Sequence, residues 1–195
     1  MNTEKFNKAI ALFDAANNQD PTEEQWAGKN YPKELLYASR MSTRMSSFAP
    51  EAGEALQLSA RCQHICRWEI PRDSYAMDRT GYLLWRKDLK KFHAKKASEI
   101  LNSVGYESDI VDKVSFLLLK KQLKKNTDTQ LLEDVICLVF LEFYFDAFAK
   151  KYEEEKLIDI IQKTWKKMSE KGHQAALEIS YAPSSLALIQ KALTT

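Results

Sequence analysis

The segment QLLEDVICLVFLEFYFDAFAKKY, residues 130–152, decides the fold class of this chain. It reads as a helix that is apolar nearly all round from Val135 onward, and such a helix belongs at the centre of a bundle. Its start carries the exceptions, Glu133 and Asp134. Because a buried carboxylate is costly unless a cation, a metal or hydrogen-bond donors accompany it, we expect this pair to have a partner, for example an arginine.

The rest of the chain supplies the surrounding helices. Apolar residues recur at helical spacing in 6–13, 33–48, 51–68, 82–104, 108–118 and 155–170, followed by a weaker tail helix over 186–193. Residues 17–32 are expected to be turn and loop, and no stretch alternates like a strand. The pattern predicts an all-α, single-domain bundle of about seven to eight helices. Residues 1–32 would pack on a helical body of residues 33–178, with a tail helix in residues 179–195.

Composition excludes several classes of protein. With 195 residues and 45% hydrophobic content the chain can bury a substantial core, and its net charge of +2 does not by itself indicate nucleic acid or an anionic membrane. The three cysteines show neither a disulfide framework nor a zinc spacing. The first residues lack the apolar segment of a signal peptide, and the longest apolar region contains Glu142 and Asp146. We therefore expect a soluble cytoplasmic protein with no membrane partner.

Candidate chemistry starts in SARCQHICRWEIPR, residues 59–72, where Gln63 and His64 end an apolar helix beside arginines. A second histidine, His93, falls on the inward face of the helix expected over 82–104. Each histidine can equally be a packed, hydrogen-bonded side chain of the core or part of a site.

The arginines are unevenly distributed. All seven lie between positions 40 and 86, whereas the rest of the chain uses lysine: Arg40, Arg44, Arg61, Arg67, Arg72, Arg79 and Arg86. A guanidinium holds phosphate or carboxylate through two hydrogen bonds, so this clustering indicates anion recognition or buried ion pairs in equal measure. The irregular residues 69–81 among them, with the aromatic residues nearby, would either cap a pocket or pin the loop to the body.

Four blocks of sequence resemble a known family. They are ARCQHICRWEIPR (60–72), MDRTGYLLWRKDLKKFHA (77–94), QLLEDVICLVFLE (130–142) and KTWKKMS (163–169). They look like signature blocks of the domain-of-unknown-function family 4202, and the resemblance extends over roughly residues 33–177. That family brings no established activity with it.

A more distant resemblance is to the HD superfamily of helical, metal-dependent phosphohydrolases, and it implies an HD-domain-like fold. Gln63 and His64 stand at the place of the superfamily's His-Asp pair, His93 at that of its intermediate histidine and Asp134 at that of its late aspartate. The pair is thus altered, and the early helix offers Tyr37 or Ser39 instead of a histidine. The resemblance implies one divalent metal, Mn, Fe, Ni or Zn, held by His64, His93 and Asp134.

Two functions follow as hypotheses. In the first, a pocket binds a phosphate-containing, nucleotide-like small molecule and a metal-dependent phosphohydrolase reaction takes place there, with Glu133 as general base and His64 beside it. The ligand-binding residues would be Tyr37, Arg61, Gln63, Arg67, Arg72, Arg79 and Arg86. In the alternative, the protein is a non-catalytic module whose arginine and aromatic surface binds a protein or nucleic acid, and the histidines and aspartate are purely structural.

Overall fold

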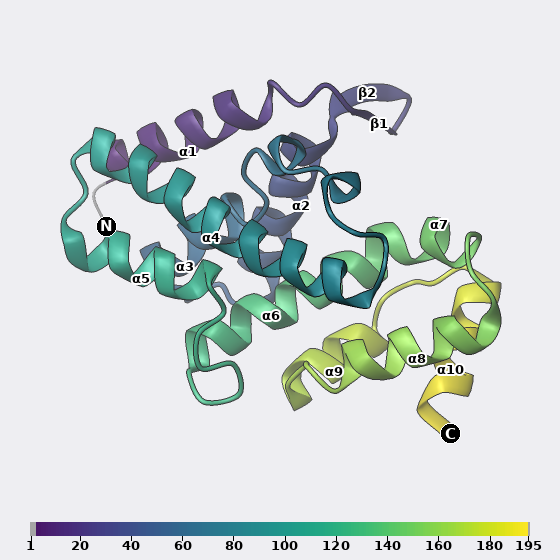
Figure 1. Ribbon diagram of the computed structural model, residues 1–195. Coiled ribbons are helices and arrows are strands. Elements are labelled where there is room, and N and C mark those ends of the chain that lie inside the picture. The colour runs from purple at the N-terminus through teal and green to yellow at the C-terminus, as the bar shows by residue number, and fades with distance from the viewer. Residues whose placement is uncertain (1–2, 195) are drawn as a thin grey trace. The chain divides into compact units, whose positions relative to one another are not determined.

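The computed structural model describes residues 3–194 and is mostly helical, as the sequence predicts (Figure 1). Within that range it has ten α-helices, more than the seven or eight expected, and a small β-hairpin. The α-helices are α1 (Thr3–Asn17), α2 (Lys33–Phe48), α3 (Glu54–Arg61), α4 (Arg79–Val104), α5 (Ser108–Leu118), α6 (Thr127–Val139), α7 (Phe145–Ala149), α8 (Glu154–Trp165), α9 (Glu170–Leu177) and α10 (Pro183–Thr194). None of these helices is long and apolar enough to cross a lipid bilayer.

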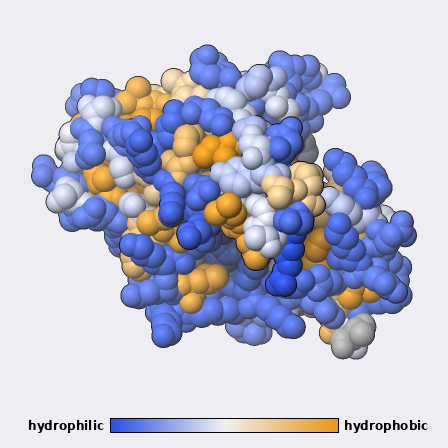
Figure 2. All heavy atoms as spheres, viewed as in Figure 1, coloured by the Kyte–Doolittle hydropathy of each residue, from blue (hydrophilic) through white to orange (hydrophobic). Residues whose placement is uncertain are grey.

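The chain divides into two compact units, the first ending at Lys121 and the second starting at Gln122. The boundaries suggested by the sequence, at residues 32 and 178, do not coincide with this division and remain a prediction. Hydrophilic side chains cover most of the face shown in Figure 2, with smaller hydrophobic areas between them.

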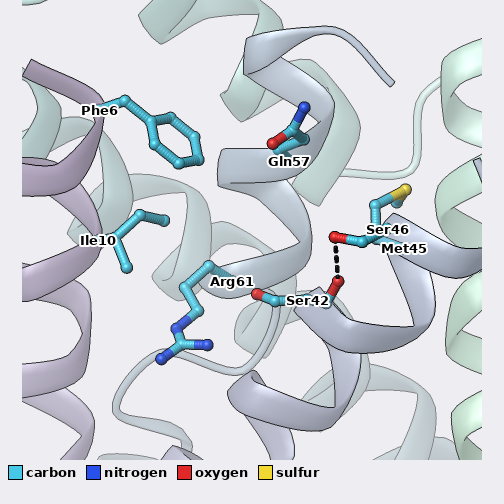
Figure 3. A pocket seen from close by; sticks show the side chains of 7 residues that line it. All are labelled: Phe6, Ile10, Ser42, Met45, Ser46, Gln57 and Arg61. Atoms are coloured by element: carbon cyan, nitrogen blue, oxygen red, sulfur yellow. Dashed lines mark hydrogen bonds between the residues drawn. The ribbon is translucent and has the colours of Figure 1, made fainter. Parts of the chain in front are cut away.

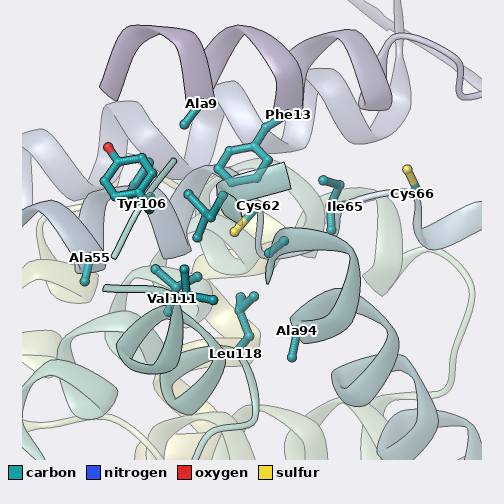
Figure 4. Close-up of a cluster of buried hydrophobic side chains, with 14 residues drawn as sticks. Ala9, Phe13, Ala55, Cys62, Ile65, Cys66, Ala94, Tyr106, Val111 and Leu118 are labelled. Atoms are coloured by element: carbon teal, nitrogen blue, oxygen red, sulfur yellow. The ribbon is translucent and has the colours of Figure 1, made fainter. Parts of the chain in front are cut away.

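The core of the first unit lies among α1, α3, α4 and α5. Phe13 of α1, Cys62 and Ile65 after α3, and Val114 of α5 are fully buried in one cluster, part of which is drawn in Figure 4. Apolar residues recur at helical spacing in α1, α4 and α5, which places one apolar face of each helix in this cluster. The segment 59–72 is therefore largely buried up to Cys66, whereas its later residues are half-buried or exposed.

A β-hairpin occupies part of the region expected to be loop. Strands β1 (Glu23–Trp26) and β2 (Lys29–Pro32) pair antiparallel, and both residues of the turn, Ala27 and Gly28, have positive φ. Two positive φ values in a two-residue turn match the twist of a hairpin. The strands are four residues long and mostly exposed, so they lack the buried alternation by which a strand is recognised in a sequence.

The helix expected over 51–68 is shorter than predicted. It begins at Glu54 and ends at Arg61, and turns follow up to Cys66, whose φ of 50° is left-handed. The backbone N–H of Cys66 donates to Oδ1 of Asn17 at 3.0 Å, which fixes the turn against the end of α1. A short 3₁₀ helix, η1 (Arg67–Glu69), comes next, and a second, η2 (Arg72–Ser74), follows it. The change of direction at Cys66 determines where His64 and Arg67 point.

The second unit is built around the apolar segment 130–152. Instead of one continuous helix it forms α6, a π-helical turn η3 (Phe140–Tyr144) and α7, with Val135, Leu138 and Phe145 completely buried. Helix α10 packs on α8 and begins at Pro183, a residue that suits the first turn of a helix. The sequence identified the buried segment correctly but gave no sign of the π-turn that divides it.

Candidate functional site

The first unit contains a polar group of side chains that we call the histidine cluster: Glu34, Tyr37, His64, Arg67 and His93. Glu34 and Tyr37 lie three residues apart on one face of α2, His64 and Arg67 flank the left-handed turn at Cys66, and His93 comes from α4. The ring of Tyr37 stacks on that of His64 with centroids 4.1 Å apart and planes 13° from parallel. The His64 and His93 centroids are 5.8 Å apart. Three separate elements thus bring the two predicted histidines together.

The contacts of His64 define its protonation. Nη1 of Arg67 lies 3.1 Å from its Nε2, and a guanidinium only donates, so Nε2 accepts and the ring proton is on Nδ1. That nitrogen lies 3.4 Å from Oε2 of Glu34. Burial lowers the pKa of His64 well below 6.5, and the charges of Arg67, Lys120, Arg86 and Lys33 lower it further. His64 is therefore a neutral ring in a positive environment.

Glu34 is the acidic member of the cluster. Its carboxylate is buried, with Nε of Arg67 at 3.9 Å from Oε1, and its pKa is raised by burial although Arg67, Lys33 and His93 act in the opposite direction. The charges of four cationic side chains thus reach His64, whereas only Arg67 and Lys33 among them act on Glu34. The side chains of Arg67 and His64 keep 26% and 22% of their surface exposed, so this part of the cluster is open to solvent.

His93 is oriented by the backbone. Its Nδ1 donates to the carbonyl oxygen of Ile65 at 2.8 Å, which leaves Nε2 as an acceptor. Residues 3–194 offer this Nε2 no hydrogen-bond partner, and the side chain is only 4% exposed. Oε1 of Gln63 is likewise buried without a partner in the described chain. Leaving a buried acceptor unpaired costs about 1–3 kcal/mol, so the cluster contains unused hydrogen-bonding capacity.

The histidines give the protein a predicted acid sensitivity. Burial and the neighbouring His64 lower the pKa of His93 to about 3, so from pH 6.5 down to about 3 the unfolded chain binds a proton that the folded chain does not. The folded state must then lose stability as the pH falls through that window. In urea unfolding between pH 6 and pH 5, the loss in the parent protein should exceed that in His93→Gln by about 1 kcal/mol.

Because the pKa of Glu34 is raised in the folded state, this group adds stability as the pH falls, opposite to His93. Glu34 is present in the parent protein and in His93→Gln, so its contribution largely cancels when the two losses of stability are compared. Identical pH dependence in the two proteins would show that His93 is not held neutral by the fold.

Most of the predicted arginines are engaged outside the cluster. Arg61 binds both carboxylate oxygens of Asp14 at 2.6 Å and lines a separate pocket between α1, α2 and α3 (Figure 3). Arg72 donates to the backbone carbonyls of the irregular loop, at residues 75, 76 and 78. Arg79 is exposed at the start of α4. Among the predicted ligand-binding arginines, Arg67 lies in the cluster and the charge of Arg86 reaches it.

Asp134 has hydrogen-bond partners, as expected for a buried carboxylate, but none of the partners described below is an arginine. In the second unit its Oδ1 accepts from Ser169 N at 2.8 Å and from Gln130 Nε2 at 3.0 Å, and its Oδ2 accepts from Ser169 Oγ at 2.5 Å. Ser169 is also the N-cap of α9, where its hydroxyl accepts from Gly172 N. Neutral donors therefore hold a completely buried carboxylate. Glu133, the predicted general base, is buried beside it on α6.

Gly172 provides a prediction about this network. A Cβ at that position would lie 2.8 Å from Oδ1 of Asp134, and the carboxylate cannot retreat without losing Ser169. We expect Gly172→Ala to lower the free energy of unfolding by about 1–3 kcal/mol. In an Asp134→Ala background the clash is absent, and alanine favours a helix by about 1 kcal/mol, so the same change should cost nothing. Denaturant unfolding of the two single variants and the double variant measures this. If the double variant lost as much free energy of unfolding as the two single variants together, a steric contact between position 172 and Asp134 would be contradicted.

The predicted metal site gains no support from these contacts. Its ligands His64, His93 and Asp134 come from both units, and among the described residues no three His, Cys, Asp or Glu side chains form a group that could hold a metal ion. His64 has Arg67 against one ring nitrogen and Glu34 near the other. Metal binding, and Glu133 as general base, remain predictions.

Sequence patterns did not single out Glu34, a member of the cluster, or Lys33 and Lys120, whose charges reach His64. Glu34 follows Lys33 in the first turn of α2, where an acidic residue is ordinary on solvent-facing surface, and Lys120 belongs to a lysine-rich helix end. The available signal was the spacing of Glu34 and Tyr37, which puts both on one face of α2. Nothing local shows that this face turns toward His64.

The fold and the cluster define a mostly helical protein with a partly exposed, positively charged histidine site. The chain belongs to the family described as domain of unknown function DUF4202, whose model matches residues 7–189. This confirms the first resemblance and extends it to nearly the whole chain. No curated protein and no solved structure matches the chain. The more distant likeness to the HD superfamily therefore has no support from these comparisons.

Proposed function

We propose that this protein binds a phosphate-containing small molecule at the histidine cluster. The observation that carries the proposal is the state of Arg67. Its guanidinium has five N–H donors, of which the described residues accept one, at Nε2 of His64. A guanidinium that is three-quarters buried yet makes one hydrogen bond has donors left for an anion, and phosphate accepts two of them in parallel.

The surroundings of Arg67 support the same proposal. Its guanidinium carbon lies 4.8 Å from the centroid of Trp85, whose indole N–H donates to the carbonyl of Ile70 at 2.9 Å, so a fixed aromatic ring positions the cation. The charges of Arg86, Lys33 and Lys120 add to the positive potential at His64. An anion entering this site is attracted by several charges and oriented by one planar group.

The proposal concerns binding and leaves hydrolysis aside. A metal-dependent reaction would need a metal on His64, but one nitrogen of that ring is an acceptor for Arg67 and the other carries its proton toward Glu34. A cation at that position would displace one of these contacts and lie beside a guanidinium. Neutral His64 is better suited to fix the orientation of Arg67.

A second candidate function rests on the exposed start of α4. Tyr82 is 42% exposed, with the guanidinium groups of Arg72 and Arg86 at 6.0 and 5.9 Å from its ring centroid, and the neighbouring Leu83 is also exposed. Such a mixture of aromatic, aliphatic and arginine side chains is common at the centre of protein interfaces and on nucleic-acid surfaces. A nucleic-acid partner would bind with a steep loss of affinity as salt rises, whereas a small phosphate compound at the histidine cluster would respond weakly.

Tryptophan fluorescence tests where the anion binds. Because Trp85 lies against Arg67, titration with sodium phosphate or adenosine monophosphate at constant ionic strength should give a saturable change in emission, and Trp85→Phe should abolish it. Trp165→Phe serves as the matched control because Trp165 belongs to the second unit, where it stacks on His173. A response lost in Trp165→Phe and kept in Trp85→Phe would place the anion elsewhere and refute the proposed site.

A further inference from the structure

If phosphate binds at the histidine cluster as proposed, the unpaired Nε2 of His93 indicates which chemical class of phosphate compound the site takes. We infer that the ligand carries a hydroxyl group close to its phosphate and donates it to Nε2 of His93, so that the ligand class is a polyol or sugar phosphate, nucleotides included. The phosphate would bind Arg67, and the hydroxyl would meet the histidine on α4.

The position of the acceptor is fixed by the fold. Nδ1 of His93 is committed to the Ile65 carbonyl, so the ring cannot exchange its two nitrogens without breaking a 2.8 Å hydrogen bond. The ring is buried on α4 and lies 5.8 Å, centroid to centroid, from His64, which itself contacts Arg67. The charges of Arg67 and Glu34 act on His93 as well, which places its ring within the same cluster.

A neutral donor fits this acceptor better than a cation does. An ammonium group or a metal ion at Nε2 would approach the positive charges that already surround His64. A hydroxyl adds no charge and satisfies the lone pair at low desolvation cost. Oε1 of Gln63, the residue before His64, is a second buried acceptor without a partner in the described chain.

The test compares phosphate esters that differ in their hydroxyl groups. Glycerol 3-phosphate and ribose 5-phosphate should bind at least about tenfold more tightly than n-propyl phosphate, because a site that pairs its acceptor with a ligand hydroxyl discriminates against the compound lacking it. In His93→Phe this preference should disappear, so that glycerol 3-phosphate and n-propyl phosphate bind with similar affinity to each other. In His93→Gln, which keeps an acceptor oxygen, part of the preference should return.

The outcomes separate this inference from the proposed function. Equal affinity for glycerol 3-phosphate and n-propyl phosphate, with both lost in Arg67→Ala, overturns the hydroxyl inference and leaves the phosphate site intact. Absence of binding by every ester and by inorganic phosphate overturns the proposed function and the inference with it. Stoichiometric metal in the purified protein that His93→Gln loses would assign Nε2 to a metal and overturn the inference. The comparison of esters on the parent protein needs no variant, so it remains decisive if His93→Phe fails to fold.

Discussion

Replacing Asp134 with alanine is expected to lower the free energy of unfolding by about 2–4 kcal/mol, among the largest effects of any single substitution in the second unit. The carboxylate is completely buried and accepts from the backbone N–H and the hydroxyl of Ser169 and from the amide of Gln130. Alanine leaves these donors without their acceptor in the interior and releases the residue that caps α9. Urea unfolding followed by circular dichroism measures the loss.

A matched control is Asp159→Ala in the same unit. Asp159 is 54% exposed on α8 and pairs with Lys163 one helical turn away. Exposed pairs of this kind contribute about 0.3–0.5 kcal/mol, so this variant should unfold almost like the parent protein. If Asp134→Ala were as stable as Asp159→Ala, the network around Ser169 would not be the structural element described above, and a ligand role for Asp134 would regain support.

Replacing Arg67 with alanine is expected to weaken phosphate-ester binding by about tenfold to a hundredfold, the value of one or two charge-assisted hydrogen bonds. The effect arises because Arg67 supplies the planar donor group of the cluster and stacks on Trp85. Arg67→Lys keeps the charge but loses the planar guanidinium that donates two parallel hydrogen bonds to a phosphate. The affinity of this variant should therefore fall between those of the parent protein and Arg67→Ala. Isothermal titration calorimetry at fixed ionic strength gives the three dissociation constants.

Arg79→Ala is the control for this series. Arg79 also lies in the arginine-rich region, at the exposed start of α4. Its replacement by alanine removes the same charge from the chain as Arg67→Ala does. Its affinity for the ester should change by less than about twofold, because solvent screens a distant exposed charge. Equal losses in Arg67→Ala and Arg79→Ala would mean that overall charge, and no particular site, attracts the anion.

The helical class and much of the buried surface could be predicted because they depend on periodicity. The apolar faces of α1, α2, α4 and α5, and the buried segment led by Val135, repeat every three or four residues over several turns. The hairpin and the change of chain direction after α3 depend on single backbone conformations, at Ala27, Gly28 and Cys66. A non-glycine residue in the left-handed region is stabilised by contacts distant in sequence, here Asn17, and leaves no local pattern.

The candidate site was predictable to the extent that it consists of residues on identifiable faces. The inward position of His93 follows from helical spacing, and the need of Asp134 for a partner follows from the cost of burying a charge. The identities of the partners do not follow. Arg61, Arg67 and Arg72 are similar in a sequence, yet they contact a carboxylate, a histidine and backbone carbonyls respectively. Those differences arise from tertiary contacts.

Phosphate binding at the histidine cluster is tested most directly by a crystal structure of the protein with a bound phosphate ester, for which glycerol 3-phosphate at saturating concentration is the probe. We expect a tetrahedral phosphate within hydrogen-bond distance of the Arg67 guanidinium, with His64 still stacked on Tyr37. A phosphate bound only at other residues, or an empty histidine cluster under conditions in which calorimetry shows saturation, would contradict it.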